Sequence, residues 1–333
     1  MGCDCINYFP KGTRSADVEE FLMILGFKKG KKGLFSGNFG KPFNYYVDDH
    51  YRHITGVYSE LYWDPDDRDQ LCLWTRTTIW RSKFDSDFHN FTIKQIKKRF
   101  GGHFKSDFGK NRYFKFEGPV REKAEAGALA AYSRFHRNIN RAERMISFSN
   151  LLDDSKYEIH GIDFVDSLNP RIVSTNVLVP FVVAAIEDYF RSLYIALLKY
   201  SDKRDKIFQR AKLSGSELPA IAYGELSVAE AVAKWMTFQD LSKVNQAMKE
   251  IDDRYDIHGM LKKPHGRAKE SHWNLLERLI EQRHALIHHA ELDSEYLPIR
   301  FKRDLKRVET AVWRIYQELI RLNSWEPVDK SEV

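Results

Sequence analysis

Hydrophobic positions in the first 118 residues alternate between helical and strand spacing. A short helix is predicted where apolar residues recur every three or four positions before Gly26, at Val18, Phe21, Leu22 and Leu25. Three β-rich runs follow, at residues 43–47, 54–63 and 70–80. A helix over residues 88–100 then precedes a hairpin of residues 104–108 and 112–116, turning at Gly109. Together these elements predict an α+β domain over residues 1–118, with a small antiparallel sheet and two helices.

From residue 119 onward the strand pattern disappears and helical spacing continues. A long amphipathic stripe over residues 121–150 predicts a connecting helix, within a linker of residues 119–170. Further helical runs occupy residues 177–200, 203–212, 227–235, 238–253, 269–289 and 297–323. They predict an all-α helical bundle over residues 171–325, with a tail at 326–333.

Composition separates the same two parts of the chain. A length of 333 residues exceeds what one compact core usually holds, and 43% hydrophobic with 30% charged residues is typical of a globular protein. Residues 1–120 hold 20 of the 53 lysines and arginines but only 15 of the 47 acidic residues. Most of the net charge of +6 is therefore N-terminal, as are 24 of the 45 aromatic residues.

No pattern of membrane insertion or export is visible. The longest apolar stretch, residues 172–186, is interrupted by polar residues and a proline, which favours a buried helix. Cys3, Cys5 and Cys72 have no paired spacing, as expected in a reducing compartment. We therefore expect a cytoplasmic protein without membrane contact or disulfides. Cys3 and Cys5 lack further metal ligands, so a frayed or strand-bound N-terminus is the favoured interpretation.

Three short motifs are interpreted as loops and turns. Residues 35–42 are rich in glycine but lack the first Gly and the final Ser or Thr of a P-loop. Residues 107–109 copy a kinase tripeptide without any of its companion motifs. The four aspartates of residues 64–69 lack the glycine and terminal Glu of an EF-hand, which favours a turn between strands.

The candidate chemistry lies at the end of the helix predicted over residues 269–289. An arginine and three histidines gather there, at Arg283, His284, His288 and His289. Positions five apart lie about 140° around a helix, so Arg283 and His288 do not share a face, whereas His284 and His288 do.

Two interpretations of this group involve no RNA. Histidines at a helix C-terminus interact favourably with the helix dipole, by up to about 1 kcal/mol. Alternatively, His284 and His288 would bind zinc together with Glu281 or a residue from elsewhere. The zinc interpretation is disfavoured because it places the permanent cation Arg283 within one turn of a dication.

Residues 283–288, with the sequence RHALIH, resemble the R-x4-H motif of ribonuclease-type HEPN domains. The segment Phe238-Gln239-Asp240-Leu241, followed by Asn245, resembles the Phe-Gln…Asn segment of one group of these domains. Glu187 occupies the place of an acidic residue in that group. The resemblance covers about residues 170–325 and leaves the N-terminal domain unidentified.

This resemblance implies an endoribonuclease that needs no metal or cofactor. His288 would accept the proton of a 2′-hydroxyl, and Arg283 would hold the phosphoryl oxygens with a bidentate fork. The products would carry a 2′,3′-cyclic phosphate and a 5′-hydroxyl, with a water or a second histidine, such as His284, protonating the leaving oxygen. Glu187 would orient Arg283 or a histidine, or would simply be a buried, paired carboxylate.

The family also implies a homodimer with a composite active site, in toxin or antiphage (abortive infection) defence. The alternative is a catalytically inactive HEPN module that binds RNA, a nucleotide or a partner protein. A basic loop before the arginine and histidine helix either guides RNA to the site or is simply solvated, and its residues are Lys262, Lys263, Arg267 and Lys269.

Basic residues interleave with aromatic ones in the N-terminal domain. They are Lys28, Lys29, Lys31, Lys32, Lys94, Lys97, Lys98 and Arg99. This mixture is suited to single-stranded nucleic acid, by phosphate contact and base stacking. Most of the aromatic residues must also fill a core, and recognition of a trigger or antitoxin protein is an equal alternative.

Overall fold

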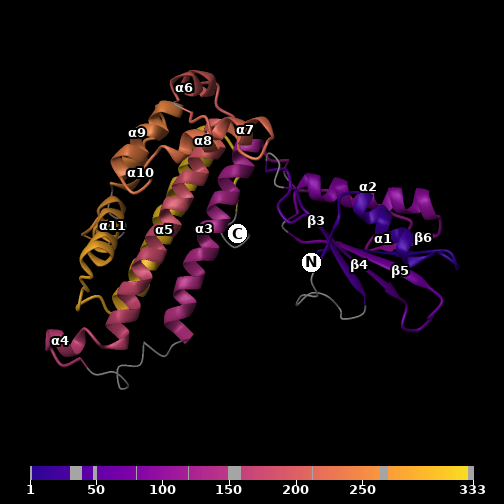
Figure 1. The fold of residues 1–333 in the computed structure, drawn as a ribbon, viewed down its shortest axis with the longest axis horizontal. Coiled ribbons are helices and arrows are strands. Elements are labelled where there is room, and N and C mark those ends of the chain that lie inside the picture. The colour runs from indigo at the N-terminus through magenta and orange to yellow at the C-terminus, as the bar shows by residue number, and fades with distance from the viewer. Residues whose placement is uncertain are drawn as a thin grey trace. The chain divides into compact units, whose positions relative to one another are not determined.

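The structure is a computed structural model that describes residues 2–30, 40–47, 51–79, 81–118, 120–148, 159–211, 213–262 and 269–328. The chain forms two compact units, the first comprising residues Met1–Arg121 and the second beginning at Glu122 (Figure 1). The first contains an antiparallel sheet with helices and the second is mostly helical. The predicted order, α+β followed by all-α, is confirmed at this level.

The first unit is a seven-stranded sheet with two helices. Its strands are β1 (Cys3–Tyr8), β2 (Lys28–Lys29), β3 (Lys41–Tyr45), β4 (Val57–Trp63), β5 (Leu71–Thr77), β6 (His103–Ser106) and β7 (Gly109–Lys110). Its helices are α1 (Ser15–Ile24) and α2 (Lys83–Phe100). The strand order is β2-β3-β4-β5-β1-β6-β7, and every neighbouring pair is antiparallel.

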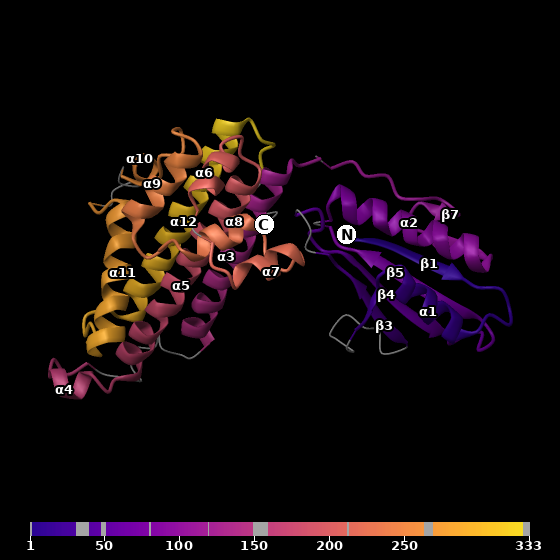
Figure 2. The same ribbon diagram turned by 45° about the horizontal axis from the view of Figure 1, so that its top comes forward.

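Both helices pack on the same face of this sheet. Figure 2 shows α2 lying along the strands. The core between them is formed by Val18 and Leu22 of α1, Ile93 and Ile96 of α2, and the strand residues Phe43, Val57, Leu61, Leu71, Leu73 and Phe104. α2 begins five residues before the predicted start because Ser82 and Asp85 form a capping box that satisfies the first backbone N–H groups.

Of the two alternatives for the N-terminus, frayed or strand-bound, the strand-bound one is confirmed: β1 lies between β5 and β6, near the middle of the sheet. One prediction for the first unit needs correction. The predicted hairpin is shorter than expected, because its second strand, β7, has only two residues. Residues 112–116 form no strand, since the Asn90 side chain of α2 holds the backbone of Phe114, accepting from its N–H at 3.0 Å and donating to its carbonyl at 2.9 Å.

The second unit is a helical bundle. Its helices are α3 (Lys123–Phe148), α4 (Asp163–Asp166), α5 (Pro170–Lys199), α6 (Arg204–Arg210), α7 (Glu217–Ala222), α8 (Val228–Lys234), α9 (Leu241–Ile251), α10 (Ile257–Leu261), α11 (His272–His289) and α12 (Pro298–Asn323). The short helices α4, α7 and α10 were not predicted. Each has six residues or fewer, which is too short for a repeating apolar pattern to be recognised.

Helix α3 was predicted as a connector, but it belongs to the bundle. It runs beside α5 in both views (Figure 1 and Figure 2), and it also packs on α12. Phe135 meets Tyr189 of α5 with ring centroids 5.6 Å apart, and Tyr132 stacks on Tyr316 of α12 at 5.3 Å. Because these rings are fully buried, α3 contributes to the core that unites the bundle.

Helix α5 is long and apolar enough to cross a membrane by length and composition, although half of the relevant window is buried inside the bundle. Tyr189, Phe190 and Leu193 lie in the core. Its outer side keeps two apolar side chains in solvent, since Val177 is 58% exposed and Phe181 is 38% exposed.

Candidate active site

Helix α11 carries three of the four predicted catalytic residues, Arg283, His284 and His288, in its last two turns, and the fourth, Glu187, lies in α5. Helix α11 begins at the N-cap Ser271, whose hydroxyl accepts from the N–H of Asn274 at 3.1 Å. Trp273, Leu276 and Leu279 bury its first turns in the bundle core. No residue of α11 after Leu279 is buried, so the end of the helix from Arg283 onward lies at the surface of the second unit.

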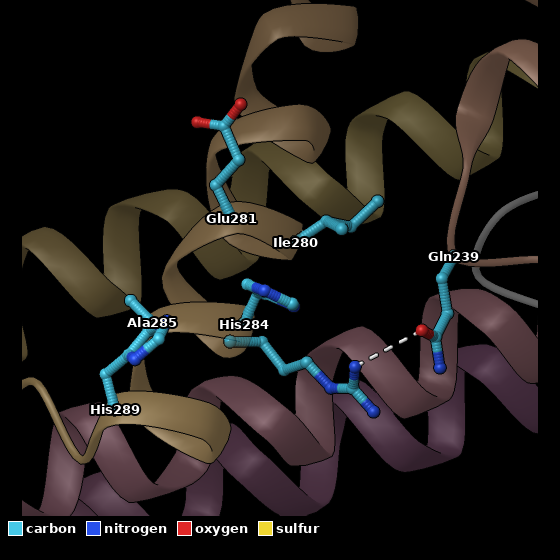
Figure 3. Close-up of a pocket in the computed structure, with 7 residues that line it drawn as sticks. Gln239, Ile280, Glu281, His284, Ala285 and His289 are labelled. Atoms are coloured by element: carbon cyan, nitrogen blue, oxygen red, sulfur yellow. Dashed lines mark hydrogen bonds between the residues drawn. The ribbon is translucent and has the colours of Figure 1, made fainter.

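The side chain of Arg283 points toward the segment before α9. Its Nη1 donates to Oε1 of Gln239 at 3.3 Å, the bond drawn dashed in Figure 3. The amide nitrogen of Gln239 donates in turn to Oε2 of Glu187 at 3.4 Å. Both bonds are long, and each is correspondingly weak. Glu187, predicted to orient Arg283 or a histidine, therefore reaches the arginine only through Gln239.

Gln239 is held by its neighbours on both sides. Phe238 is buried against Tyr194, with ring centroids 6.0 Å apart, and the guanidinium of Arg191 lies over its ring at 5.6 Å. On the other side Asp240 caps α9 by accepting from the N–H of Lys243 at 3.1 Å. A buried ring and a helix cap thus fix the backbone that carries the Gln239 amide.

The histidines form a second group on α11. The rings of His284 and His288 lie 4.4 Å apart between centroids, which confirms that these residues share one face of the helix. His289 is also near, at 6.2 Å from the His284 ring. All three side chains are exposed. Arg283 and His288 make no direct contact, as the angular separation of about 140° predicts.

A surface pocket of about 340 Å³ lies beside this group. Its lining residues are Gln239, Ile280, Glu281, Arg283, His284, Ala285 and His289. The volume is at the small end for ligand sites. His288 is not among the lining residues, although its ring lies 4.4 Å from that of His284, which is.

The zinc interpretation loses support from this geometry. Glu281 points away from His284 in Figure 3. Throughout the described ranges, no group of three or more His, Cys, Asp or Glu side chains is arranged to hold a metal ion. The aspartates between β4 and β5 instead form a turn, in which the Asp64 and Asp67 carboxylates accept from the backbone N–H groups of Asp66 and Asp69.

Other residues singled out from the sequence lie elsewhere. Asn245 is not beside Arg283: its Oδ1 accepts from the N–H of His258 at 3.0 Å, at the start of α10. Lys262 is exposed at the end of α10. Lys269 is exposed shortly before α11, whose first residue lies about 16 Å along the helix axis from Arg283. Lys263 and Arg267 fall outside the described residues.

Sequence reasoning did not select Gln239 as a site residue, although it lay within the quoted Phe-Gln segment. Its role depends on a contact between residues 44 positions apart, which spacing does not reveal. Searches against protein-family models, curated proteins and solved structures found no match to this chain.

Proposed function

We propose that the helical unit is a metal-independent endoribonuclease of HEPN type. The observation that carries this proposal is the set of contacts that the Arg283 side chain makes. Its guanidinium is partly buried in a pocket with two imidazoles, and among the described residues its side chain makes no ion pair with a carboxylate. An arginine held by one neutral amide keeps its full charge for a phosphate.

Cleavage by the neighbouring 2′-hydroxyl needs a base, an acid and a fixed cation. His288 would take the hydroxyl proton, and the fork of Arg283 would stabilise the charge that builds on the phosphoryl oxygens. His284, whose ring is 4.4 Å from that of His288, or a water would return a proton to the leaving 5′-oxygen. The link through Gln239 to Glu187 would keep the guanidinium turned into the pocket.

A second copy of the chain would complete the site. In one protomer Arg283 lines the pocket and His288 does not. Exposed apolar residues accompany this region, at Val177 and Phe181 of α5 and at Ile287 of α11, which is 55% exposed. A homodimer formed over these residues would bury apolar surface and bring a partner's histidine toward Arg283.

The biological setting is an expectation from the family resemblance alone. We expect a cytoplasmic effector in toxin or antiphage defence, controlled by a trigger or antitoxin protein. The alternative, a catalytically inactive HEPN module that binds RNA, a nucleotide or a protein, is favoured by one observation. His288 is exposed, and within the described part of the chain no hydrogen bond orients its ring.

The decisive experiment is incubation of the purified protein with RNA in excess EDTA. The wild type should produce fragments ending in 2′,3′-cyclic phosphate, and Arg283→Ala and His288→Ala should not. Equal RNA cleavage by the wild type and both variants would refute the nuclease proposal. Loss of cleavage in EDTA that zinc restores would favour the metal site instead.

The dimer is tested separately with Phe181→Arg. This change should convert the protein to a monomer in analytical ultracentrifugation and remove cleavage, since the arginine places an unpaired charge in the interface. Tyr223→Arg, at an exposed aromatic residue on the C-terminal side of α7, is the matched control and should change neither property. A Phe181→Arg monomer that still cleaves would show that one chain suffices.

A further inference from the structure

The sheet of the first unit has one face that its two helices do not cover. Successive side chains along a strand point to opposite faces. Val57, Ser59 and Leu61 of β4 face the helices, so Tyr58, Glu60 and Tyr62 face the other way. The same alternation in β5, β1 and β6 sends the following residues to that second face: Cys72, Trp74, Arg76, Asp4, Ile6, Tyr8, His103 and Lys105.

Aromatic rings from four strands meet on this open face. The pairing of Tyr62 with Cys72, of Cys72 with Tyr8, and of Tyr8 with His103 places these residues in one row across the sheet. Tyr8 stacks on His103 with ring centroids 4.9 Å apart and planes 10° apart. The small Cys72 separates the two tyrosines, and burial, followed by the neighbouring Cys72 and Tyr8, raises the pKa of Tyr62.

A second pair of rings lies in the adjacent rows. Trp74 contacts Tyr58 edge to face at 5.6 Å, and the guanidinium of Arg76 lies 5.7 Å from the Trp74 ring. Tyr8, Tyr58, Tyr62 and Trp74 are all only partly buried. The face therefore offers ring surface to a ligand without any rearrangement of the sheet.

Positive charge lies at both edges of the same face. Lys28 pairs with Asn44 at the β2 edge, and Lys105 pairs with Lys110 at the β6–β7 edge. Strands 4.7–4.9 Å apart place β2 and β6 about 24 Å from each other. Lys29, one residue later, faces the helices and forms an ion pair with Glu19 of α1 at 3.5 Å.

Three acidic groups lie on this face or at its end, and each accepts a hydrogen bond. One is Asp64, which follows Trp63, alternates to the same face as Tyr62, and accepts from the N–H of Asp66 at 3.0 Å. Glu60 is only 3% exposed and accepts from the N–H of Gly40 at 2.8 Å. The carboxylate of Asp4 accepts from Nε1 of Trp74 at 2.9 Å and lies 3.7 Å from Nε of Arg76. The basic groups Lys28, Arg76, Lys105 and Lys110 thus outnumber the acidic ones, and the lysines lie at the edges where a backbone would cross.

We propose that this open sheet face binds single-stranded RNA. Unpaired bases would stack on the rings of Tyr8, Tyr62 and Trp74, while the lysines at the edges contact phosphates. A duplex would bind less well, because its bases are already stacked on one another. Aromatic rings also occur at protein interfaces, but lysines are depleted there, so the lysines at both edges favour a nucleic acid. This binding does not involve Arg283 or His288, so it stands whether or not the helical unit cleaves RNA.

The test measures the binding of a fluorescent single-stranded RNA of about twelve nucleotides by anisotropy. Full-length protein carrying His288→Ala is used throughout, so that cleavage does not alter the probe. Adding Tyr62→Leu or Tyr8→Leu, which keep apolar volume but remove the ring, should weaken binding about tenfold. Lys28→Ala should weaken binding and reduce its dependence on salt.

Matched controls lie on the same strands. Trp63→Ala removes an exposed ring of β4 that alternates to the helix side, and Lys29→Ala removes the neighbouring charge that pairs with Glu19. Both should leave the affinity within twofold. The proposal is overturned if Tyr62→Leu and Tyr8→Leu bind as tightly as their parent, if Trp63→Ala weakens binding equally, or if duplex RNA binds as well as the single strand. It also fails if the ring variants change only the oligomeric state.

Discussion

The two units bring their chemically distinctive side chains together in opposite ways. In the helical unit, one stretch of α11 supplies Arg283, His284 and His288, and only Gln239 and Glu187 come from elsewhere. In the sheet unit, Tyr8, Tyr62 and His103 become neighbours only through strand pairing across nearly a hundred residues. The first arrangement concentrates a cation and titratable groups at one point, as bond cleavage requires. The second spreads rings and charge over a surface, which suits binding along a chain.

The largest expected effect distinguishes residues that act in RNA cleavage from residues that act in RNA binding. Arg283→Ala and His288→Ala should each lower the cleavage rate by roughly 10²–10⁴, since in the proposed mechanism each removes a group that acts in the transition state. Tyr62→Leu should instead raise KM and leave kcat nearly unchanged, because it acts on binding alone. Single-turnover and steady-state cleavage of a defined RNA measure both quantities. A fall in kcat for Tyr62→Leu comparable to that for His288→Ala would break the division between the units.

The next effect concerns the independence of the two folds. Phe135→Ala removes a fully buried ring from the bundle core and should lower the free energy of unfolding of the helical unit by about 3–5 kcal/mol. The transition of the sheet unit should not move. Urea unfolding followed by hydrogen exchange in each unit measures this. Met145→Ala, at a 62% exposed position of the same helix, is the control and should cost less than about 0.5 kcal/mol.

A smaller effect is the dependence of the sheet unit's stability on pH. His89 is fully buried in the sheet unit, where its Nε2 lies 2.8 Å from the Thr75 hydroxyl, and burial, aided by the charge of Arg81, lowers its pKa to about 3. Since the unfolded chain takes up a proton near pH 6.5 and the folded one does not, stability is complete above that pH and falls as pH decreases toward 3. The loss should reach about 2 kcal/mol at pH 5.

Thermal unfolding of the sheet unit between pH 7.5 and 5 measures this dependence. His89→Gln keeps a side chain able to bond with Thr75 but does not titrate, so it should flatten the curve. An unchanged slope in His89→Gln would assign the pH dependence to other groups.

The smallest effect tests the link that holds Arg283. Gln239→Ala removes one long hydrogen bond and should lower the cleavage rate about fivefold, in line with a contribution near 1 kcal/mol. Gln246→Ala, at an exposed glutamine of α9, is the matched control. If Gln239→Ala costs as much as Arg283→Ala, the glutamine touches RNA itself rather than orienting the arginine.

Elements with long periodic patterns were predictable from the sequence, and those defined by distant contacts were not. The apolar spacing of α5, α11 and α12 located the bundle, but the same spacing in α3 did not reveal that its stripe packs on α5 and α12. Strand β1 was weakly indicated because its sequence, CDCINY, is short and places polar residues between small ones. Asn90 shortened the predicted hairpin by a side-chain contact that no local pattern encodes.

The same limit applies to the candidate site. Helical geometry correctly predicted that His284 and His288 share one face of the helix. It also predicted that Arg283 and His288 lie on different faces. It did not give the partner of Arg283, because Gln239 lies before another helix. Nor did it separate the basic residues of the first unit by face: Lys28 lies on the open side of the sheet, whereas Lys29 lies on the helix side with α1.

The position of β1 has a consequence for how the first unit acquires its structure. Its residues pair with β5, about 70 positions later, and with β6, about 100 positions later. Closing such long loops carries an entropic cost that only the finished contacts repay. A growing chain therefore holds β1 unpaired until its partners have left the ribosome. Helix α3 waits still longer for α12, since Tyr132 stacks on Tyr316, 184 positions later. We expect each unit to complete its fold only after its last partner element has been synthesised.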